Sequence, residues 1–238
     1  MNDLNPILYT IKPGDTLYNL AIQYGTTVQD LMNTNLSLDP YHLRIGQQIY
    51  IYPNSNNYWI SIHQVNLSNN MNLAWIEHIL WTRMLLISIA ESLNDLDATK
   101  ARLLENPKDI ANIFKKYYGN NIANTIQKLL TEHLVIGGDL IVALKNNNQK
   151  LASELNTKWY KNADDMADAF SSINPFYPKE EVRHMLYEHL KLTTNEVTAR
   201  LRKDYQADIK AYDLVQKEIL EMSQFFVDGI VKQFPDLF

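Results

Sequence analysis

The chain has 238 residues, of which 46% are hydrophobic, and its formal net charge is −5. This length and this share of apolar residues allow a substantial core in one medium or two smaller domains, and they exclude a disordered chain. Acidic and basic residues are interspersed, so no basic patch for nucleic acid or for an anionic membrane surface is present. The absence of cysteine excludes disulfides and thiol chemistry.

The first 53 residues predict a small domain of mixed structure. A short β-type run at 9–11 stops at a Pro-Gly turn, and an alternating strand at 48–52 closes the region. Between them, Thr16 and Thr27 are suited to cap two short helices with apolar faces. The expected order is strand, helix, helix, strand.

This region, from Leu8 to Pro53, resembles the LysM domain. The matching motifs are the opening YxIKPGDTLYxLAxxYG, Asn35 after the second helix, and the ending LRIGQQIYIYP. The resemblance implies binding of an N-acetylglucosamine polymer, peptidoglycan or chitin, in a shallow groove between two loops. Carried over by position, the implied glycan-binding residues are Gly14, Asp15, Thr16, Leu17, Leu38, Asp39 and Pro40.

The N-terminus contains no basic segment followed by an apolar core, so no secretory signal is expected. The longest apolar run, 79–90, is too short to cross a bilayer and contains Arg83, so no membrane insertion is expected either. We therefore expect synthesis in a cytoplasm and a location in the bacterial cell wall or in the spore coat or cortex. A wall-binding chain without an export signal must reach its ligand by another route. The spore explains this, because its coat and cortex are assembled without export across a membrane, and release by lysis or earlier removal of a signal are the competing explanations.

Residues 54–72 are rich in Asn and Ser and predict a linker. From Leu73 onward, apolar residues repeat at steps of three and four, and Pro and Gly mark the breaks. The range 73–238 is therefore expected to form an all-α bundle of six to eight helices. The expected fold class is α+β, a small βααβ domain followed by a helical bundle.

Self-similarity in the helical region suggests three units of about 56 residues, each a helix pair. The Glu-His pairs that end at His78, His133 and His189 recur 55 and 56 residues apart. Downstream, the segments 106–114 and 162–170 match at an offset of 56, and 218–226 follows at the same offset.

The three histidines, His78, His133 and His189, lie on the apolar faces of their expected helices. Imidazoles and the neighbouring carboxylates of facing helices can hold zinc or iron inside a bundle. The alternative is three hydrogen-bonded core histidines. It is favoured because an adjacent Glu points about 100° away on a helix, and because the Glu-x-x-His spacing of di-iron bundles is absent.

The helical region also resembles a helical domain family of uncharacterised function found in spore-forming bacteria. The matching motifs are HxxWTR at 78–83, RLLxNPxDI at 102–110, YYG at 117–119 and GIxxQFPxxF at 229–238. This resemblance implies no active-site residues.

We expect a non-catalytic wall- or spore-associated protein with no cofactor, in which the glycan-binding module tethers a helical domain with a structural or protein-interaction role. The alternative is a metal-binding helical bundle, with zinc or iron on the three histidines, targeted by the same module. A wall hydrolase ranks last. No paired carboxylates, nucleophile elbow, P-loop or HExxH helix is visible in the sequence.

Overall fold

The computed structural model of the chain describes residues 6–35, 38–39, 43–52 and 62–238. Contacts divide the chain into two compact units, Met1–Trp59 and Ile60–Phe238. The two are called here the N-terminal unit and the helical unit, and each is described by itself.

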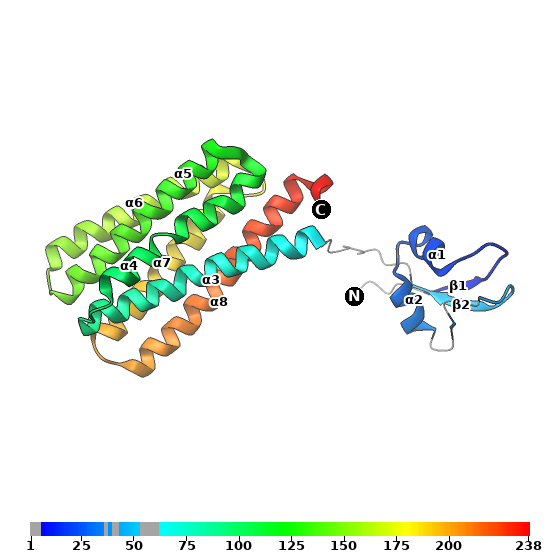
Figure 1. Cartoon of the computed structure of the whole chain (residues 1–238), viewed down its shortest axis with the longest axis horizontal. Helices are drawn as coiled ribbons and strands as arrows, with labels where there is room; N and C mark the ends of the chain where they lie inside the picture. The colour runs from blue at the N-terminus through cyan, green and yellow to red at the C-terminus, as the bar shows by residue number, and fades with distance from the viewer. Residues whose placement is uncertain (1–5, 36–37, 40–42, 53–61) are drawn as a thin grey trace. The chain divides into compact units, whose positions relative to one another are not determined.

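The N-terminal unit has the predicted order of strand, helix, helix, strand (Figure 1). Its elements are β1 (Ile7–Thr10), α1 (Leu17–Gln23), α2 (Val28–Thr34) and β2 (Gln48–Ile51). The two strands pair antiparallel, with Ile7 opposite Ile51. The side chains of Thr16 and Thr27 accept hydrogen bonds from backbone N–H groups three residues on, at 3.1 Å and 2.7 Å, and so cap the two helices as predicted.

Asn35 joins the second helix of this unit to the second strand. Its side-chain amide donates to the carbonyl oxygens of Leu31 and Tyr50, and its oxygen accepts from the N–H of Tyr50 at 2.9 Å. The core that these bonds close consists of Ile11, Leu17, Leu20, Ala21, Leu31, Leu38, Ile49 and Ile51.

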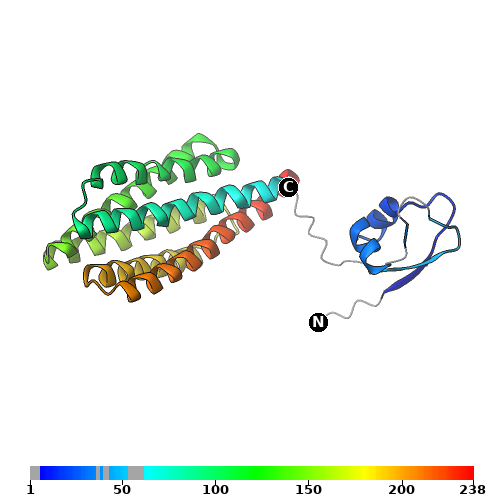
Figure 2. The same ribbon diagram turned by 60° about the horizontal axis from the view of Figure 1, so that its bottom comes forward.

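The helical unit is an all-α bundle, which confirms the predicted class (Figures 1 and 2). Within the described residues it contains α3 (Ile62–Glu91), α4 (Leu96–Leu103), α5 (Asn106–Lys145), α6 (Gln149–Ile173), α7 (Lys179–Leu201), α8 (Tyr205–Gln233) and the short 3₁₀ helix η1 (Pro235–Leu237). The long helices pack in the order α3, α5, α6, α7 and α8, and α8 packs against α3.

The predicted linker is wrong over its second half. Residues 62–72 are the first turns of α3, and Leu67 and Met71 are buried in the core of the bundle. The Asn- and Ser-rich composition predicted a loop, but burial of these two side chains outweighs weak helix propensity. The helices therefore begin before residue 73. The remainder of the predicted linker, 54–61, lies outside the described residues.

The helix α3 is 30 residues long. Its stretch His63–Glu91 is long and apolar enough to cross a bilayer by length and composition alone. A core helix passes the same test, and α3 lies between α5 and α8 with Met71, Trp75 and Ile79 buried. Its apolar composition is thus accounted for by packing inside the bundle.

Helix α5 is interrupted at Gly119, which has φ 78° and ψ −179°. A positive φ of this kind is strained for residues with a side chain, and glycine adopts it without penalty. The break divides α5 into a first segment, 106–118, and a second segment, 120–145.

The three predicted units fall on three helix pairs. The first pair is α3 with the first segment of α5, the second pair is the second segment of α5 with α6, and the third pair is α7 with α8. Phe114, Phe170 and Phe226, at matching positions, meet in the core with ring centroids 4.6 to 5.7 Å apart. The core is therefore built from corresponding residues of each pair, while a common origin of the three units stays a prediction.

Candidate metal centre

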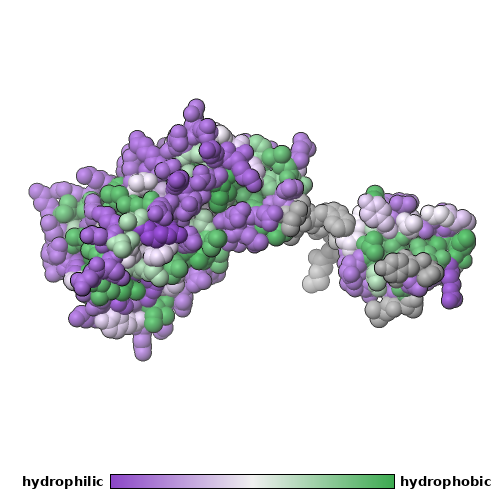
Figure 3. Space-filling model, viewed as in Figure 1, coloured by the Kyte–Doolittle hydropathy of each residue, from purple (hydrophilic) through white to green (hydrophobic). Residues whose placement is uncertain are grey.

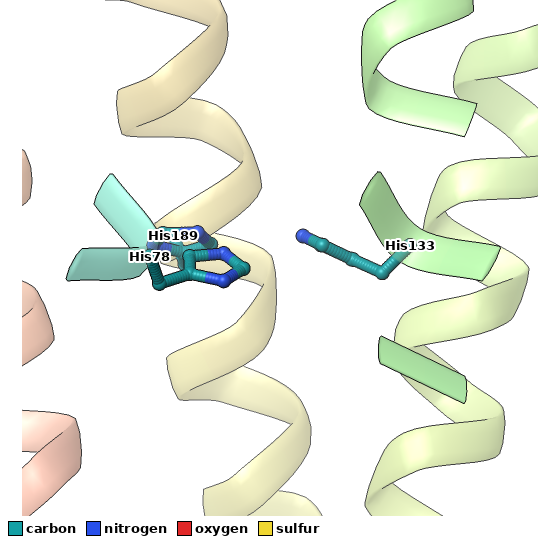
Figure 4. Close-up of side chains that lie close together, drawn as sticks. All are labelled: His78, His133 and His189. Carbon is teal, nitrogen blue, oxygen red and sulfur yellow. The ribbon is translucent and has the colours of Figure 1, made fainter. Parts of the chain in front are cut away.

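The three histidines singled out in the sequence converge inside the bundle (Figure 4). His78 comes from α3, His133 from the second segment of α5 and His189 from α7, and all three are at most 5% exposed. Their ring centroids form a nearly equilateral triangle with sides of 5.9, 5.9 and 6.1 Å. One ring nitrogen of each lies within 4.8 Å of the other two.

The first pair fixes the orientation of His78 through Asn106. The Asn106 side-chain amide donates to the carbonyl oxygen of Ala74 at 2.8 Å, which leaves Oδ1 facing His78 Nδ1 at 3.0 Å. Because Oδ1 only accepts, Nδ1 must carry the proton. The lone pair of His78 therefore resides on Nε2, the other ring nitrogen.

The second and third pairs repeat this arrangement with differences. Asn162 donates to the carbonyl oxygen of Leu129 at 3.1 Å, four residues before His133, as Ala74 is before His78. His133 Nδ1 and Asn162 Oδ1 are both buried, and neither makes a hydrogen bond within the part of the chain that the structure describes. In the third pair, the Nδ1 of His189 lies 2.9 Å from Oε2 of Glu218, a carboxylate in place of the amide.

Burial sets the protonation of two of the histidines. The cost of desolvating a cation is the largest cause that lowers the pKa of His78 to about 3, and the nearby His189 adds to it. The pKa of His133 is lowered well below its ordinary value by burial first and then by His78 and His189, although the proximity of Asn162 raises it. Both rings are neutral near pH 7, the form that binds metals.

Two tryptophans flank the triangle with apolar rings. The ring of Trp75 lies 5.6 Å from that of His78 and stacks on Phe226 at 5.8 Å. The Trp159 ring lies 5.2 Å from that of His133, and its indole N–H donates to the His133 carbonyl at 3.0 Å. These contacts place aromatic rings against His78 and His133.

The glutamates that precede the histidines face away from the triangle. Glu77 pairs with Arg102 at 3.0 Å, while Glu132 and Glu188 pair with nearby lysines of their own helices and are 48% and 37% exposed. The expectation that these carboxylates point about 100° away from the histidines is met.

A second polar cluster, which the sequence did not indicate, lies two helical turns beyond His189. Arg83 contacts Glu196 at 2.5 Å and Asp208 at 2.8 Å, and Arg200 approaches Asp208 at 3.4 Å. Burial raises the pKa of Glu196 to about 7, which the bond from Arg83 counters only in part. The partners of Arg83 are more than 100 residues away in the chain, so no local pattern could have revealed the cluster.

The glycan-binding residues predicted in the first loop have structural tasks. Gly14 is exposed and has φ +88°, and the Asp15 carboxylate accepts from Lys12 N at 2.7 Å and from the Tyr9 hydroxyl at 3.0 Å. Thr16 caps α1, and Leu17 belongs to the core.

In the second loop, Leu38 is buried, Asp39 is exposed, and Pro40 lies outside the described residues. Glycan contact by either loop stays a prediction. Sequence reasoning passed over the exposed apolar side chains of the N-terminal unit (Figure 3). They include Leu8, Tyr18, Ile22, Ile45, Tyr50 and Tyr52.

Comparison with known proteins identifies only the N-terminal region. The LysM domain model matches residues 9–51. Similar curated proteins include "Probable endopeptidase p60" of Listeria welshimeri and of Listeria seeligeri, each 41% identical over 49 residues. The match covers 21% of this chain but only 9% of the length of each relative.

No solved structure matches the chain. The helical family suggested by the sequence motifs is not shown by these comparisons and stays a prediction. Residues 9–51 form a LysM domain, and this family assignment supports binding of peptidoglycan or of another N-acetylglucosamine polymer.

Proposed function

We propose that this protein is held at a peptidoglycan surface by its LysM domain and that its helical unit binds one transition-metal ion, zinc, through His78, His133 and His189. The observation that carries the proposal is the approach of three buried ring nitrogens to within 4.8 Å of one another. Their partners at Nδ1 support it further, since Asn106 and Glu218 leave Nε2 of His78 and His189 free to bind.

Zinc fits this donor set. Three neutral imidazoles with a fourth position left open are a common arrangement of non-structural zinc sites. At zinc–nitrogen distances of about 2.0–2.1 Å, tetrahedral ligands lie roughly 3.4 Å apart. Small ring rotations would close the present separation. Iron(II) also takes imidazole ligands and is the second metal to test.

The second candidate function is a structural or protein-interaction role for the helical unit. The bonds of His78 to Asn106 and of His189 to Glu218 favour it, because they pair one nitrogen of each ring without any metal. The two functions differ in one measurable property, the affinity for metal.

The metal is tested on tag-free, metal-stripped full-length protein by competitive zinc titration and elemental analysis. We expect one equivalent of zinc and a rise in the unfolding temperature on binding. His133→Ala should weaken binding at least about 100-fold through loss of a ligand. His63→Ala and His184→Ala, which change exposed histidines, are the matched controls. Failure to bind either zinc or iron(II) would leave the structural role.

The tether is tested by sedimentation with insoluble peptidoglycan and, separately, with chitin. We expect the full chain to sediment with peptidoglycan, in a vegetative wall or spore cortex alike, and soluble N-acetylglucosamine oligomers to release it. Asp39→Ala should weaken retention, whereas Asp30→Ala, on the exposed side of α2, should not. A chain that stays in the supernatant with both polymers would overturn the tether.

A further inference from the structure

A cavity adjoins the histidine triangle and is bounded by the next layer of the bundle. His78, His133 and His189 line it, and so do the residues four positions beyond each of them, Thr82, Gly137 and Thr193. Four residues correspond to about one helical turn, so these side chains lie directly over the histidines on the same helix faces. The rest of the wall includes Leu85, Leu140, Ile141 and Val197.

The cavity is small and mainly apolar. About 30 Å³ is available to water-sized molecules, and a water needs roughly 10–15 Å³ on this measure, so about two or three fit. Gly137 adds no side chain at this layer, and a Cβ there would come within 3.2 Å of the Trp159 ring. A ligand of two or three heavy atoms therefore matches the space.

Thr193 differs from the two other threonines of the cavity wall. The Thr82 hydroxyl donates to the His78 carbonyl at 2.7 Å, and the Thr194 hydroxyl donates to the Leu190 carbonyl at 2.8 Å. The Thr193 hydroxyl is buried and has no hydrogen-bond partner within the described protein. An unpaired buried hydroxyl is destabilising unless something else occupies its hydrogen bond, so a ligand in the cavity would meet that need.

The charges around the triangle favour a monovalent anion. A divalent ion on three neutral imidazoles carries a charge of +2, and the Glu218 carboxylate behind His189 offsets one unit. None of the residues that line the cavity is a carboxylate. A monovalent anion bound to the metal would bring the sum of the charges on the ion, Glu218 and the anion to zero.

We propose that the cavity is a ligand site in which the fourth position of the bound metal holds water or hydroxide, exchangeable for a small monovalent anion, with the Thr193 hydroxyl hydrogen-bonded to that ligand. The proposal rests on the metal site proposed above. It places an exchangeable coordination position inside the bundle, where a purely structural metal would have four protein ligands. In the exchange, the anion donates an electron pair to the metal and the water leaves.

The experiment uses the full chain with cobalt(II) in place of zinc, because the visible spectrum of cobalt reports its coordination. Azide is the probe. We expect a saturable spectral change in the wild type, and Thr193→Val should lower the azide affinity about tenfold, the loss of one hydrogen bond to a charged group. Thr193→Ser should retain it. Thr82→Val, which removes a hydroxyl already bonded to the backbone, is the matched control.

The outcomes separate the two proposals. Stoichiometric cobalt whose spectrum azide leaves unchanged would overturn the ligand site and leave the metal site standing. An azide affinity in Thr193→Val equal to that of the wild type, with cobalt still bound, would overturn the role of Thr193. A chain that binds neither cobalt nor zinc would overturn the metal site and the ligand site with it. Circular dichroism and cobalt stoichiometry establish that each variant is folded.

Discussion

The third helix pair differs from the first two in the residue that supports its histidine. Asn106 and Asn162 each donate an amide N–H to the carbonyl four residues before the histidine. Glu218 stands at the corresponding position, and its Oε2 accepts from His189, while its buried Oε1 has no hydrogen-bond partner among the described residues. An amide can satisfy the backbone and orient the ring at the same time. A carboxylate can only orient the ring.

The replacement of asparagine by Glu218 is not explained by the stability of the fold, but it would be explained by a bound metal ion. An asparagine in the third pair could donate to a backbone carbonyl, as it does in the first two. A buried carboxylate costs stability unless a positive charge is present nearby. A divalent ion on the three histidines would supply that charge. The first two pairs thus support the geometry of the triangle, and the third adjusts its charge.

The third pair also departs at Gly229, which corresponds to Tyr117 and Ile173 at offsets of 56. The missing side chain makes room for Tyr177, a residue that is 1% exposed and whose hydroxyl donates to the Phe226 carbonyl at 2.5 Å. Tyr177 also packs edge-on against the Phe226 ring at 5.3 Å. Glycine at position 229 therefore allows Tyr177 to pack between the third helix pair and the aromatic core.

The largest expected effect comes from filling that space. In Gly229→Ala, the new Cβ would lie 2.0 Å from a ring carbon of Tyr177, so the buried ring must move. We expect the free energy of unfolding to fall by about 3 kcal/mol, as for overpacked cores. Urea unfolding followed by circular dichroism measures it.

The control is Gly138→Ala, in which the Cβ would make an ordinary 3.6 Å contact with Leu85. It should be neutral or stabilising by about 0.5–1 kcal/mol through helix propensity. Equal effects at the two glycines would show that Tyr177 does not depend on the space at Gly229.

The next effect tests the amide support of the first pair. Asn106 is fully buried and bonds to both His78 and Ala74. Asn106→Ala should lower the free energy of unfolding by about 2 kcal/mol, because both partners are left unpaired in the core. Thermal and urea unfolding of metal-free protein measure it. Asn112→Ala, at an exposed site of the same helix, should change it by less than about 0.5 kcal/mol. A neutral Asn106→Ala would mean that the amide does not support the fold.

The carboxylate of the third pair should behave in the opposite way. Glu218→Gln removes a buried charge, so the metal-free protein should keep or gain stability, while the proposed zinc affinity should fall by about tenfold. Competitive zinc titration and urea unfolding of the same preparation separate the two quantities. Glu221→Gln removes a charge that is 68% exposed on the same helix, and it should change neither. A variant that loses stability and retains zinc affinity would reverse the roles assigned to Glu218 and the asparagines.

Local motifs explain why the LysM domain was predictable in detail. Its strands, caps and turns follow from residues within a few positions of one another, such as Thr16 with Asn19. The linker was mispredicted because its structure depends on distant residues. Leu67 and Met71 are buried in the helical core only through contacts with helices that are far away in the sequence. Composition alone cannot report such contacts.

The candidate metal centre was predictable in its members and not in its geometry. The repeat offset related His78, His133 and His189, and it also aligned Asn106, Asn162 and Glu218, which the structure places behind the histidines. The contact of Asn106 with a histidine 28 residues away was missed. The ion pairs of Arg83 with Glu196 and Asp208 were missed, since they join residues from three helices.

The smallest expected effect is a pH dependence of stability, in which the titration of His78 and His133 opposes that of Glu196. His78 and His133 have lowered pKa values in the folded state, so below about pH 6.5 the unfolded chain binds protons that the folded chain does not, and stability falls with pH. The raised pKa of Glu196, about 7, acts in the opposite direction, because the folded chain takes up a proton first as the pH falls.

Between pH 6.5 and 5.5, each histidine should remove about 1 kcal/mol from the free energy of unfolding and Glu196 should return about 1 kcal/mol, for a net loss of about 1 kcal/mol. In Glu196→Gln the opposing proton is absent, and the loss over the same interval should rise to about 2 kcal/mol. Urea unfolding of metal-free protein at the two pH values measures both. A wild type whose stability rises on acidification would mean that burial does not hold His78 and His133 neutral. The neutral form that binds metal would then arise only when the metal displaces the protons.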